Sequence, residues 1–296
     1  MCPGTQAGWK RIGTPRGRDE MKTWLITGAD KGLGHSLAQS ALAQGDNVVV
    51  TVLAADGQSP LAQAFPDRCR SFHLNAADHA RFPAVVAKAE AAFGGIDVLV
   101  NNAGYGLAST AEETPAEKYR PLFDVNFFGT TEMVRAVLPG MRKRRRGHVI
   151  NFSSMVGFAA APGFSFYSAA KFAVEGYSEA LAKEVAPLGI KVTIVEPGGF
   201  RSDFAGPSLD TSFSQIEDYA ELGAALRGYT AARHGKQPND PALLGPALCR
   251  IAAEAEPPLR LPLGRDALDY IRADIAQVLA ELERWEDIAG STTREP

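Results

Sequence analysis

Three side chains within a short stretch of the sequence have the chemistry of a proton-transfer site. Tyr167 and Lys171 are four residues apart, near the start of a segment (165–186) with helical apolar spacing. Side chains at positions i and i+4 lie on one face of a helix, about one turn apart. The spacing therefore predicts an ammonium beside a phenol, which lowers the pKa of the phenol and suits it to general acid or base catalysis. Ser154 follows a strand pattern at 149–152 and adds a hydroxyl that could orient a substrate oxygen.

A tyrosine and a lysine at this spacing occur often by chance, so the interpretation depends on the preceding sequence. A buried-strand pattern at 23–27 leads directly into a turn with Gly28, Gly32 and Gly34. Helical spacing and a second apolar strand, ending at Val52, follow this turn. Glycines permit a tight turn and let the backbone approach a pyrophosphate at a helix N-terminus. The order of elements predicts a dinucleotide site; the alternative is an ordinary glycine turn.

Strand and helix patterns continue to alternate along the chain. The further strands are expected at 71–74, 96–100, 149–152 and 191–196, and the helices at 77–93, 117–145 and 165–186. Such alternation predicts an α/β fold: a single-domain, Rossmann-type, doubly wound parallel sheet with helices on both faces. Ligands bind at the carboxyl ends of the strands in these sheets. The glycine turn, Asn101-Asn102, Ser154 and Pro197-Gly198 all fall at such ends, which predicts one shared site.

Length and composition fit one large domain. The chain has 296 residues, 45% of them hydrophobic, and a net charge of −3. The patterned sequence runs over 21–290, so we expect residues 1–20 to be a disordered extension and 291–296 a tail. The cysteines, Cys2, Cys69 and Cys249, have no metal-ligand spacing and indicate a reducing setting. No apolar run is long enough to span a membrane, and we expect a cytoplasmic protein without a metal.

Taken in order, the motifs resemble those of the short-chain dehydrogenase/reductase family. The resemblance covers residues 22 to about 263 and rests on Thr27-Gly28-x-x-x-Gly32-Leu33-Gly34, Asn101-Asn102-Ala103-Gly104, Asn126, Ser154, Tyr167-x-x-x-Lys171 and Pro197-Gly198. The chain beyond 240, with an expected helix at 241–253, an edge strand at 259–262 and a helix at 267–285, is similar to the branch of hydroxysteroid and retinol dehydrogenases.

The resemblance implies a role for each motif residue. Tyr167 would be the catalytic acid or base, and Ser154 would polarise a substrate carbonyl. Lys171 would also bind the nicotinamide ribose, and Asn126 would hold a water of the proton relay. The implied cofactor-binding residues are Thr27, Gly28, Lys31, Gly32, Leu33, Gly34, Asn75, Asn102, Ala103, Gly104, Tyr167, Lys171, Pro197, Gly198, Phe200 and Ser202. Asn75 and Ser202 replace an aspartate and a threonine that the family often has.

The sequence carries conflicting signs about which nicotinamide cofactor it prefers. Relatives that prefer NAD have an acidic residue at the end of the second strand, where this chain has Val52 followed by Leu53, Ala54 and Ala55. The arginine common in NADP-preferring relatives is also missing there. Lys31, directly before Gly32, remains as a candidate for the 2′-phosphate; the alternative is a solvent-facing lysine. We therefore expect a moderate preference for NADP(H), with NAD(H) possible.

A long segment, residues 199–239, would be the substrate lid according to the resemblance. It carries several aromatic side chains, including Phe204, Phe213 and Tyr229, and these predict a hydrophobic substrate; alternatively they only pack the segment down.

The function expected is hydride transfer between a nicotinamide cofactor and a ketone or secondary alcohol. The alternative is a regulatory protein that binds NAD(P) without turnover. We expect a dimer or tetramer and no binding of nucleic acid, because the basic run at 142–146 fits a solvated helix end.

Overall fold

In the computed structural model, residues 21–206, 208–211, 215–233 and 235–294 are described. They contain a sheet of seven parallel strands in the order β3-β2-β1-β4-β6-β7-β9. The strands are β1 (Thr23–Ile26), β2 (Asn47–Val52), β3 (Cys69–His73), β4 (Val98–Asn101), β6 (Gly147–Phe152), β7 (Ile190–Pro197) and β9 (Arg260–Leu263). Strand order reverses between β1 and β4, the point at which doubly wound sheets bind ligands. The predicted fold class is confirmed.

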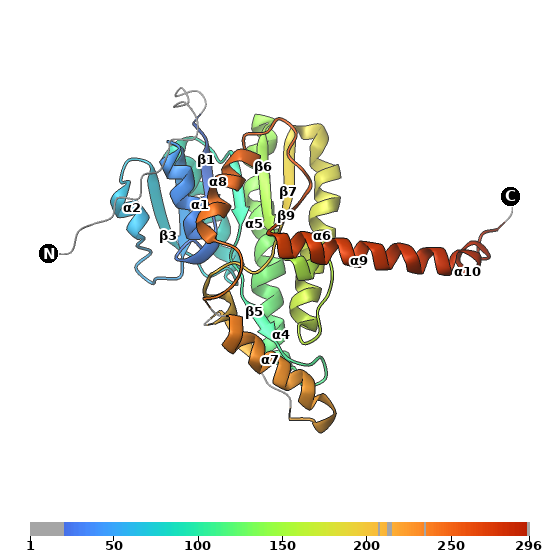
Figure 1. Cartoon of the computed structure of the whole chain (residues 1–296). Coiled ribbons are helices and arrows are strands. Elements are labelled where there is room, and N and C mark those ends of the chain that lie inside the picture. The colour runs from blue at the N-terminus through green and yellow to red at the C-terminus, as the bar shows by residue number, and fades with distance from the viewer. Residues whose placement is uncertain (1–20, 207, 212–214, 234, 295–296) are drawn as a thin grey trace.

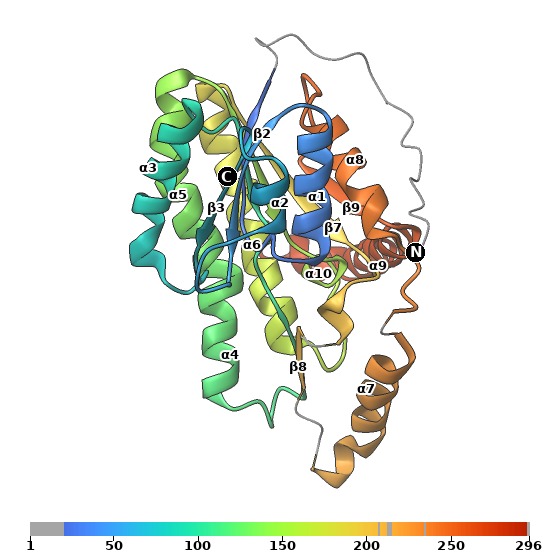
Figure 2. The same ribbon diagram turned by 90° about the vertical axis from the view of Figure 1, so that its left-hand side faces the viewer.

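Helices cover both faces of the sheet (Figures 1 and 2). α1 (Gly32–Ala43) and α8 (Pro241–Ile251) lie on one face, and α3 (Phe82–Phe93), α5 (Gly129–Arg144) and α6 (Ser165–Val185) on the other. Side chains alternate between the two faces of a strand. In β1, Trp24 and Ile26 accordingly pack with α1 and α8, while Leu25 packs with α3 and α5. These two apolar layers hold the carboxyl ends of the strands in place.

Two predicted helices are interrupted. The helix expected at 117–145 consists of α4 (Ala116–Phe123), a π-helical turn (Asp124–Phe128) and α5. Apolar periodicity does not reveal a single inserted residue, so the sequence did not show this turn. The helix expected from residue 77 begins at Phe82, after a 3₁₀ turn at His79–Arg81, with a proline in its first turn. A short helix, α2 (Pro60–Ala64), was not predicted.

The segment at 199–239 is more regular than its sequence suggested. It contributes β8 (Leu209–Thr211), which pairs with β5 (Gly106–Ala108), and α7 (Ala220–Arg233). Neither strand was predicted, because each has only three residues. Figure 2 places α7 and β8 below the carboxyl edge of the main sheet. We call residues 199–239 the lid segment; Phe213 lies outside the described residues.

The chain ends in α9 (Arg265–Arg284) and the short α10 (Glu286–Gly290). Figure 1 shows that α9 leaves the rest of the molecule as a projecting arm. Among the described residues, no helix is both long and apolar enough to cross a membrane. The expectation for residues 1–20 lies outside the described residues.

Candidate active site

The predicted catalytic side chains meet at the carboxyl edge of the sheet. Tyr167 and Lys171 lie in the first two turns of α6, and both are buried. Ser154 lies two residues after the end of β6 and caps a 3₁₀ turn at Met155–Gly157, where its Oγ accepts a hydrogen bond from the backbone N–H of Val156. The Ser154 hydroxyl also hydrogen-bonds the Tyr167 side chain. A strand end and a helix start therefore bring two hydroxyls together for one substrate oxygen.

Burial is the main influence on the proton affinity of Tyr167, and Lys171 lies close to its ring. Burial raises the pKa of Tyr167, and the hydrogen bond from Ser154 offsets only part of that rise. Lys171 donates from Nζ to the carbonyl oxygen of Phe152 at 2.8 Å, and its Nζ is 5.9 Å from the Tyr167 ring centre. The sequence predicted that Lys171 would lower the pKa of the phenol. In this structure the pKa of the phenol is raised instead, and burial is the largest cause.

Asn126 lies in the π-helical turn and is completely buried. Its side-chain amide donates to the carbonyl oxygen of Tyr105 at 2.9 Å and accepts from the N–H of Tyr105 at 3.1 Å. A Cβ at Gly104 would come within 2.8 Å of Asn126 Oδ1 and 3.6 Å of Lys171 Nζ. Gly104 therefore lets this loop pass close to both side chains. The π-helical turn fixes the loop that carries Ala103 and Gly104.

The glycine turn packs directly against the loop after β4. Gly28 has a φ of 64°, and a Cβ there would lie 2.8 Å from the Cα of Ala103. Asn102 donates from its side-chain amide to the carbonyl oxygens of Thr27 and Gly28. A Cβ at Gly34 would lie only 2.5 Å from that amide nitrogen. The two loops form a cradle that larger residues would fill, and this fits the binding of a dinucleotide.

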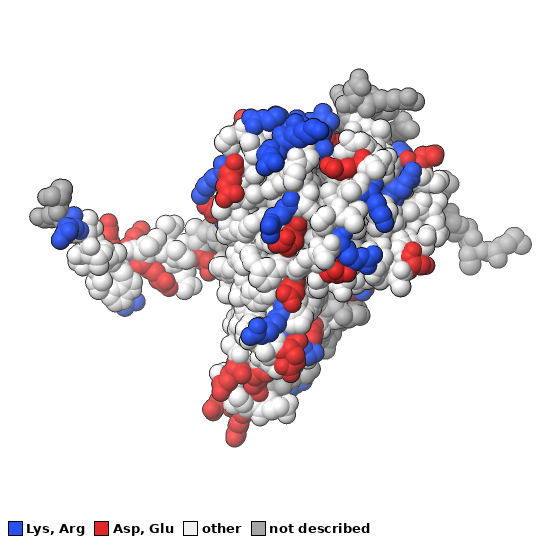
Figure 3. Space-filling model, turned by 180° about the vertical axis from the view of Figure 1, so that it is seen from behind, with Lys and Arg blue, Asp and Glu red and all other residues white. Residues whose placement is uncertain are grey.

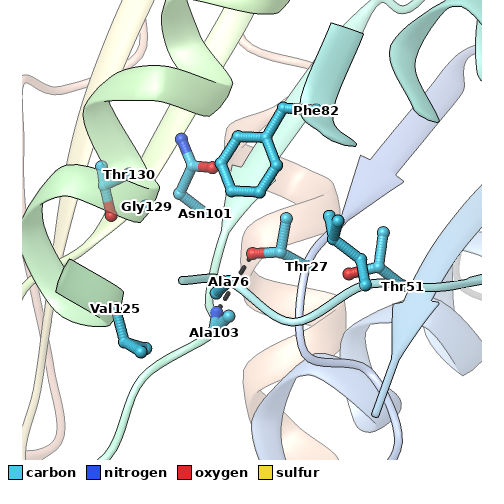
Figure 4. Close-up of a pocket in the computed structure, with 10 residues that line it drawn as sticks. Thr27, Thr51, Ala76, Phe82, Asn101, Ala103, Val125, Gly129 and Thr130 are labelled. Carbon is cyan, nitrogen blue, oxygen red and sulfur yellow. Dashed lines mark hydrogen bonds between the residues drawn. The ribbon is translucent and has the colours of Figure 1, made fainter. Parts of the chain in front are cut away.

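Thr27 supports the cradle from behind. Its Oγ1 accepts hydrogen bonds from the backbone N–H groups of Asn102 and Ala103, each at 3.1 Å. Figure 4 shows Thr27 beside Asn101 and Phe82, around a small cavity with room for about one water molecule. Thr27 therefore positions the loop after β4, and its predicted contact with the cofactor stays a prediction.

A cavity of about 880 Å³ opens at the same edge and joins the predicted cofactor and substrate regions. The predicted residues that line it are Gly28, Lys31, Gly32, Leu33, Asn75, Asn102, Ala103, Gly104, Ser154, Tyr167, Lys171, Pro197, Gly198, Phe200 and Ser202. Three predicted site residues, Thr27, Gly34 and Asn126, lie behind this lining.

Two acidic side chains near the glycine turn were missed. Asp30 lines the cavity, and its Oδ2 accepts a hydrogen bond from the N–H of Leu53 at 2.7 Å. A carboxylate therefore does lie at the end of β2, although it comes from the glycine turn and not from β2 itself. Lys31 forms an ion pair of 3.0 Å with Asp203 of the lid segment. Asp203 competes with any phosphate for the charge of Lys31.

A buried carboxylate network lies behind Lys171 and was also missed. Glu175, one helical turn after Lys171, pairs with Arg260 of β9. The same guanidinium lies 3.4 Å from Glu196, and burial followed by the nearby Glu175 charge raises the pKa of Glu196 to about 7. Burial lowers the pKa of Lys171 to about 8, and the charge of Glu175 opposes that change. The four-residue spacing between Lys171 and Glu175 was the feature of the sequence that could have revealed this network.

The lid segment supplies an aromatic wall beside Tyr167. The rings of Tyr167 and Phe204 have centroids 5.4 Å apart, and those of Phe164 and Tyr229 are 5.7 Å apart. All four side chains line the large cavity. An ion pair between Lys118 and Asp210 ties the lid segment to α4 at 2.7 Å. The part of the cavity beside Ser154 and Tyr167 is therefore lined largely by apolar rings.

Basic residues of the run at 142–146 make contacts within the protein that stabilise the fold. Figure 3 shows basic side chains gathered at the top of the molecule, whereas acidic side chains gather at the lower end. Arg144 donates to the carbonyl oxygen of Ile96, and Arg146 pairs with Asp97 at 3.4 Å. These contacts fit the predicted role of a helix end.

Comparisons with known proteins show which family this chain belongs to. The sequence model of the short chain dehydrogenases matches residues 22–212. A 3-ketodihydrosphingosine reductase of Bacteroides thetaiotaomicron is 39% identical over 245 residues, covering 81% of this chain and 87% of that protein. A short-chain dehydrogenase of Streptomyces avermitilis superimposes with a TM-score of 0.86 at 40% identity, covering 93% of this chain and 99% of that one.

A more distant structure shares the fold. It is an alcohol dehydrogenase of Thermococcus sibiricus complexed with 5-hydroxy-NADP, with a TM-score of 0.67 and 21% identity over 82% of this chain and 96% of that one. A doubly wound sheet with a glycine cradle and a serine–tyrosine–lysine group is the arrangement of an oxidoreductase. The chain belongs to the short-chain dehydrogenase/reductase family, as its motifs predicted.

Proposed function

We propose that the protein is a nicotinamide-dependent reductase of hydrophobic ketones, or a dehydrogenase of the matching secondary alcohols. The observation that carries this proposal is a single cavity of about 880 Å³, lined both by the glycine cradle and by Ser154, Tyr167 and Lys171. Binding and proton transfer therefore share one site. No feature of the residues that the structure describes favours the alternative, a regulator without turnover.

Tyr167 supplies the proton in the reductive direction. Its raised pKa keeps the phenol protonated at neutral pH, so a proton is ready for the developing alkoxide. Ser154 lies beside it and donates a second hydrogen bond to the same oxygen, which stabilises negative charge as it forms. Lys171, held by the carbonyl of Phe152, keeps positive charge close to the site.

The cradle of Gly28, Gly32 and the Asn102–Gly104 loop fits the cofactor's pyrophosphate and ribose. When bound, the nicotinamide supplies the hydride chemistry. NADP(H) is the favoured form because Lys31 lines the cavity at the glycine turn, and the Thermococcus sibiricus relative holds an NADP derivative. The carboxylate of Asp30 opposes a second phosphate, so the preference is moderate and NAD(H) is also accepted.

The substrate is an apolar ketone. Phe164, Phe204 and Tyr229 line the cavity next to the catalytic tyrosine. The Bacteroides thetaiotaomicron relative is, by its name, a 3-ketodihydrosphingosine reductase, and so a reductase of a ketone. A ketone with a long or bulky apolar group is therefore the first substrate class to test.

The test is a panel of ketones with NADPH, followed by its absorbance, for the wild type and Tyr167→Phe. The phenylalanine keeps the ring and removes the transferable proton, so turnover should fall by about a hundredfold or more. Tyr177→Phe is the matched control, because Tyr177 lies on the same helix and packs against Phe127 outside the cavity. A Tyr167→Phe enzyme with more than about a tenth of the wild-type rate contradicts the proposal.

A further inference from the structure

The arm formed by α9 exposes a row of large apolar side chains. Its base is packed: Ala267 and Ile271 are buried, and Tyr270 donates from its hydroxyl to the carbonyl oxygen of Ala160 at 2.9 Å. Further along, the arm projects from the molecule (Figure 1). The exposed apolar residues there are Ile275 at 42%, Val278 at 47%, Leu279 at 54%, Leu282 at 63%, Trp285 at 51% and Ile288 at 61%. A helix that exposes this much apolar surface to solvent indicates an interaction site.

The spacing of these residues is that of a coiled coil. Apolar residues recur at alternating intervals of three and four, at Leu268, Ile271, Ile275, Val278, Leu282 and Trp285. This alternation produces a seam along one side of a helix, into which a second helix fits its own side chains. The first two positions lie at the packed base, so the free seam is Ile275 to Trp285.

The acidic polar side of the arm argues against binding to a membrane of anionic lipids. Residues 265–290 contain three arginines and seven acidic residues. Helices that lie on membranes usually have lysine- and arginine-rich polar faces, and anionic lipids repel acidic ones. Acidic side chains are visible along the arm in Figure 3. The arm therefore fits another helix better than a membrane surface.

We propose that the free seam joins two copies of this chain, with the two arms antiparallel. Placing Ile275 opposite Trp285 of the partner subunit also places Val278 opposite Leu282 of the partner subunit, so the exposed apolar residues cover one another. In this register Arg272 lies opposite Ile288 of the partner subunit, two residues along the helix from Glu286 of the partner subunit, so the two charges flank the seam near each other, twice by symmetry. The antiparallel pair brings Glu281 near Glu281 of the partner subunit once, whereas a parallel pair would place Glu281 near Glu286 of the partner subunit twice, so like-charge repulsion is weaker in the antiparallel pair.

The length of the arm suits this arrangement. The part of α9 beyond the base, residues 272–284, spans about 18 Å at 1.5 Å per residue, and Trp285 follows it directly, which is enough for the four apolar layers between Ile275 and Trp285. Each copy uses the same surface, which is the geometry of a closed two-fold dimer. The seam does not line the catalytic cavity, so this inference stands or fails independently of the proposed reaction.

The decisive test is disulfide formation between two different cysteine variants of the full chain. Ile275→Cys and Trp285→Cys are each made with Cys2→Ser; the remaining Cys69 and Cys249 are buried. The variants are mixed under reducing conditions, diluted, and then oxidised. We expect linked dimers in the mixture and few with either variant alone. Linkage of Ile275→Cys to itself would show parallel arms, and no linkage in any sample would remove the interface; either result overturns the proposal.

A second experiment measures mass by sedimentation. Leu282→Asp should halve the mass of the assembly, because a charge in the seam cannot be covered. Ala280→Asp adds the same charge on the opposite side of the helix and should leave the mass unchanged.

Arg272→Glu and Glu286→Arg should each weaken the dimer, and the double variant should restore it. Turnover and melting temperature serve as folding checks. An unchanged mass for Leu282→Asp overturns the proposal. So does a wild type that binds lipid vesicles together with a Leu282→Asp variant that does not, because the seam would then bind a membrane.

Discussion

Tyr167 and Lys171 are both buried, and burial affects their proton affinities in opposite directions. It raises the pKa of the phenol and lowers the pKa of the ammonium, so each side chain is driven toward its neutral form. For the tyrosine this fits the role of a proton donor. For the lysine it weakens the positive charge at the site, and the carboxylate of Glu175 counteracts that loss.

The dependence of kcat/KM on pH should show where Lys171 loses its charge. The pKa of Lys171 is lowered to about 8, so its charge is present below that pH and lost above it. We expect kcat/KM for ketone reduction to fall as the pH rises through about 8. Glu175→Gln removes the charge that holds the lysine pKa up, so the fall should move to lower pH. Initial rates from pH 6 to 10 measure the shift.

Glu179→Gln is the control for this experiment. Glu179 also pairs with Arg260, at 3.0 Å, but its carboxylate does not act on Lys171. Its profile should match the wild type. If Glu175→Gln and Glu179→Gln give the same profile, Glu175 has only a structural role in the network with Arg260.

Some site residues were predictable from the sequence because their spacing carries the information. Tyr167 and Lys171 are one helical turn apart, and Ser154 follows a strand, so their meeting needs only local structure and a parallel sheet. Asp30 and Asp203 were not predictable, because each reaches its place through the path of a loop. The burial that sets the pKa of Tyr167 depends on the lid segment and is likewise invisible in a local pattern.

At the scale of elements, the π-helical turn and the lid segment matter most. The π-helical turn carries Asn126 to the loop after β4, and apolar periodicity alone would have drawn one straight helix there. Strand β8 pairs with β5, a contact between residues about a hundred positions apart. Long alternating segments were predicted well, since their periodicity extends over many residues, whereas three-residue strands contain too little pattern.

The lid segment should set substrate size through Phe204. Its ring packs 5.4 Å from that of Tyr167 and lines the cavity, so it contacts the apolar part of a substrate near the reacting oxygen. Phe204→Ala should raise KM for bulky apolar ketones by about tenfold, in line with the loss of partial burial of one large side chain, and should affect small ketones much less. Steady-state kinetics over a size series of ketones measures the difference.

Phe172→Ala provides the comparison, because Phe172 is 44% exposed on α6 and does not line the cavity. It should leave KM unchanged for every ketone in the series. An equal rise in KM for small and bulky ketones in Phe204→Ala would argue that the ring only packs the segment down.

At the scale of the whole molecule, one edge of the sheet carries both halves of the site. The turn after β1, the loop after β4, the turn after β6 and the segment after β7 all face the same cavity. The helical layers on both faces hold these loops in register, so a ligand that spans the loops couples to the stability of the entire fold.

Cofactor binding should therefore raise the melting temperature, and by more for NADPH than for NADH. A ligand at a hundred times its dissociation constant adds about 2.7 kcal/mol to the free energy of unfolding, which corresponds to about 5 to 10 °C for a domain of this size. Lys31 is 58% exposed and shared with Asp203, so its contribution is that of an exposed charge pair. Lys31→Ala should weaken NADPH binding by about two- to fivefold and leave NADH binding unchanged. Lys88→Ala, on α3 away from the cavity, should keep the wild-type shifts with both cofactors. A wild type that NADH stabilises more than NADPH would show that Asp30 outweighs Lys31 at the end of β2.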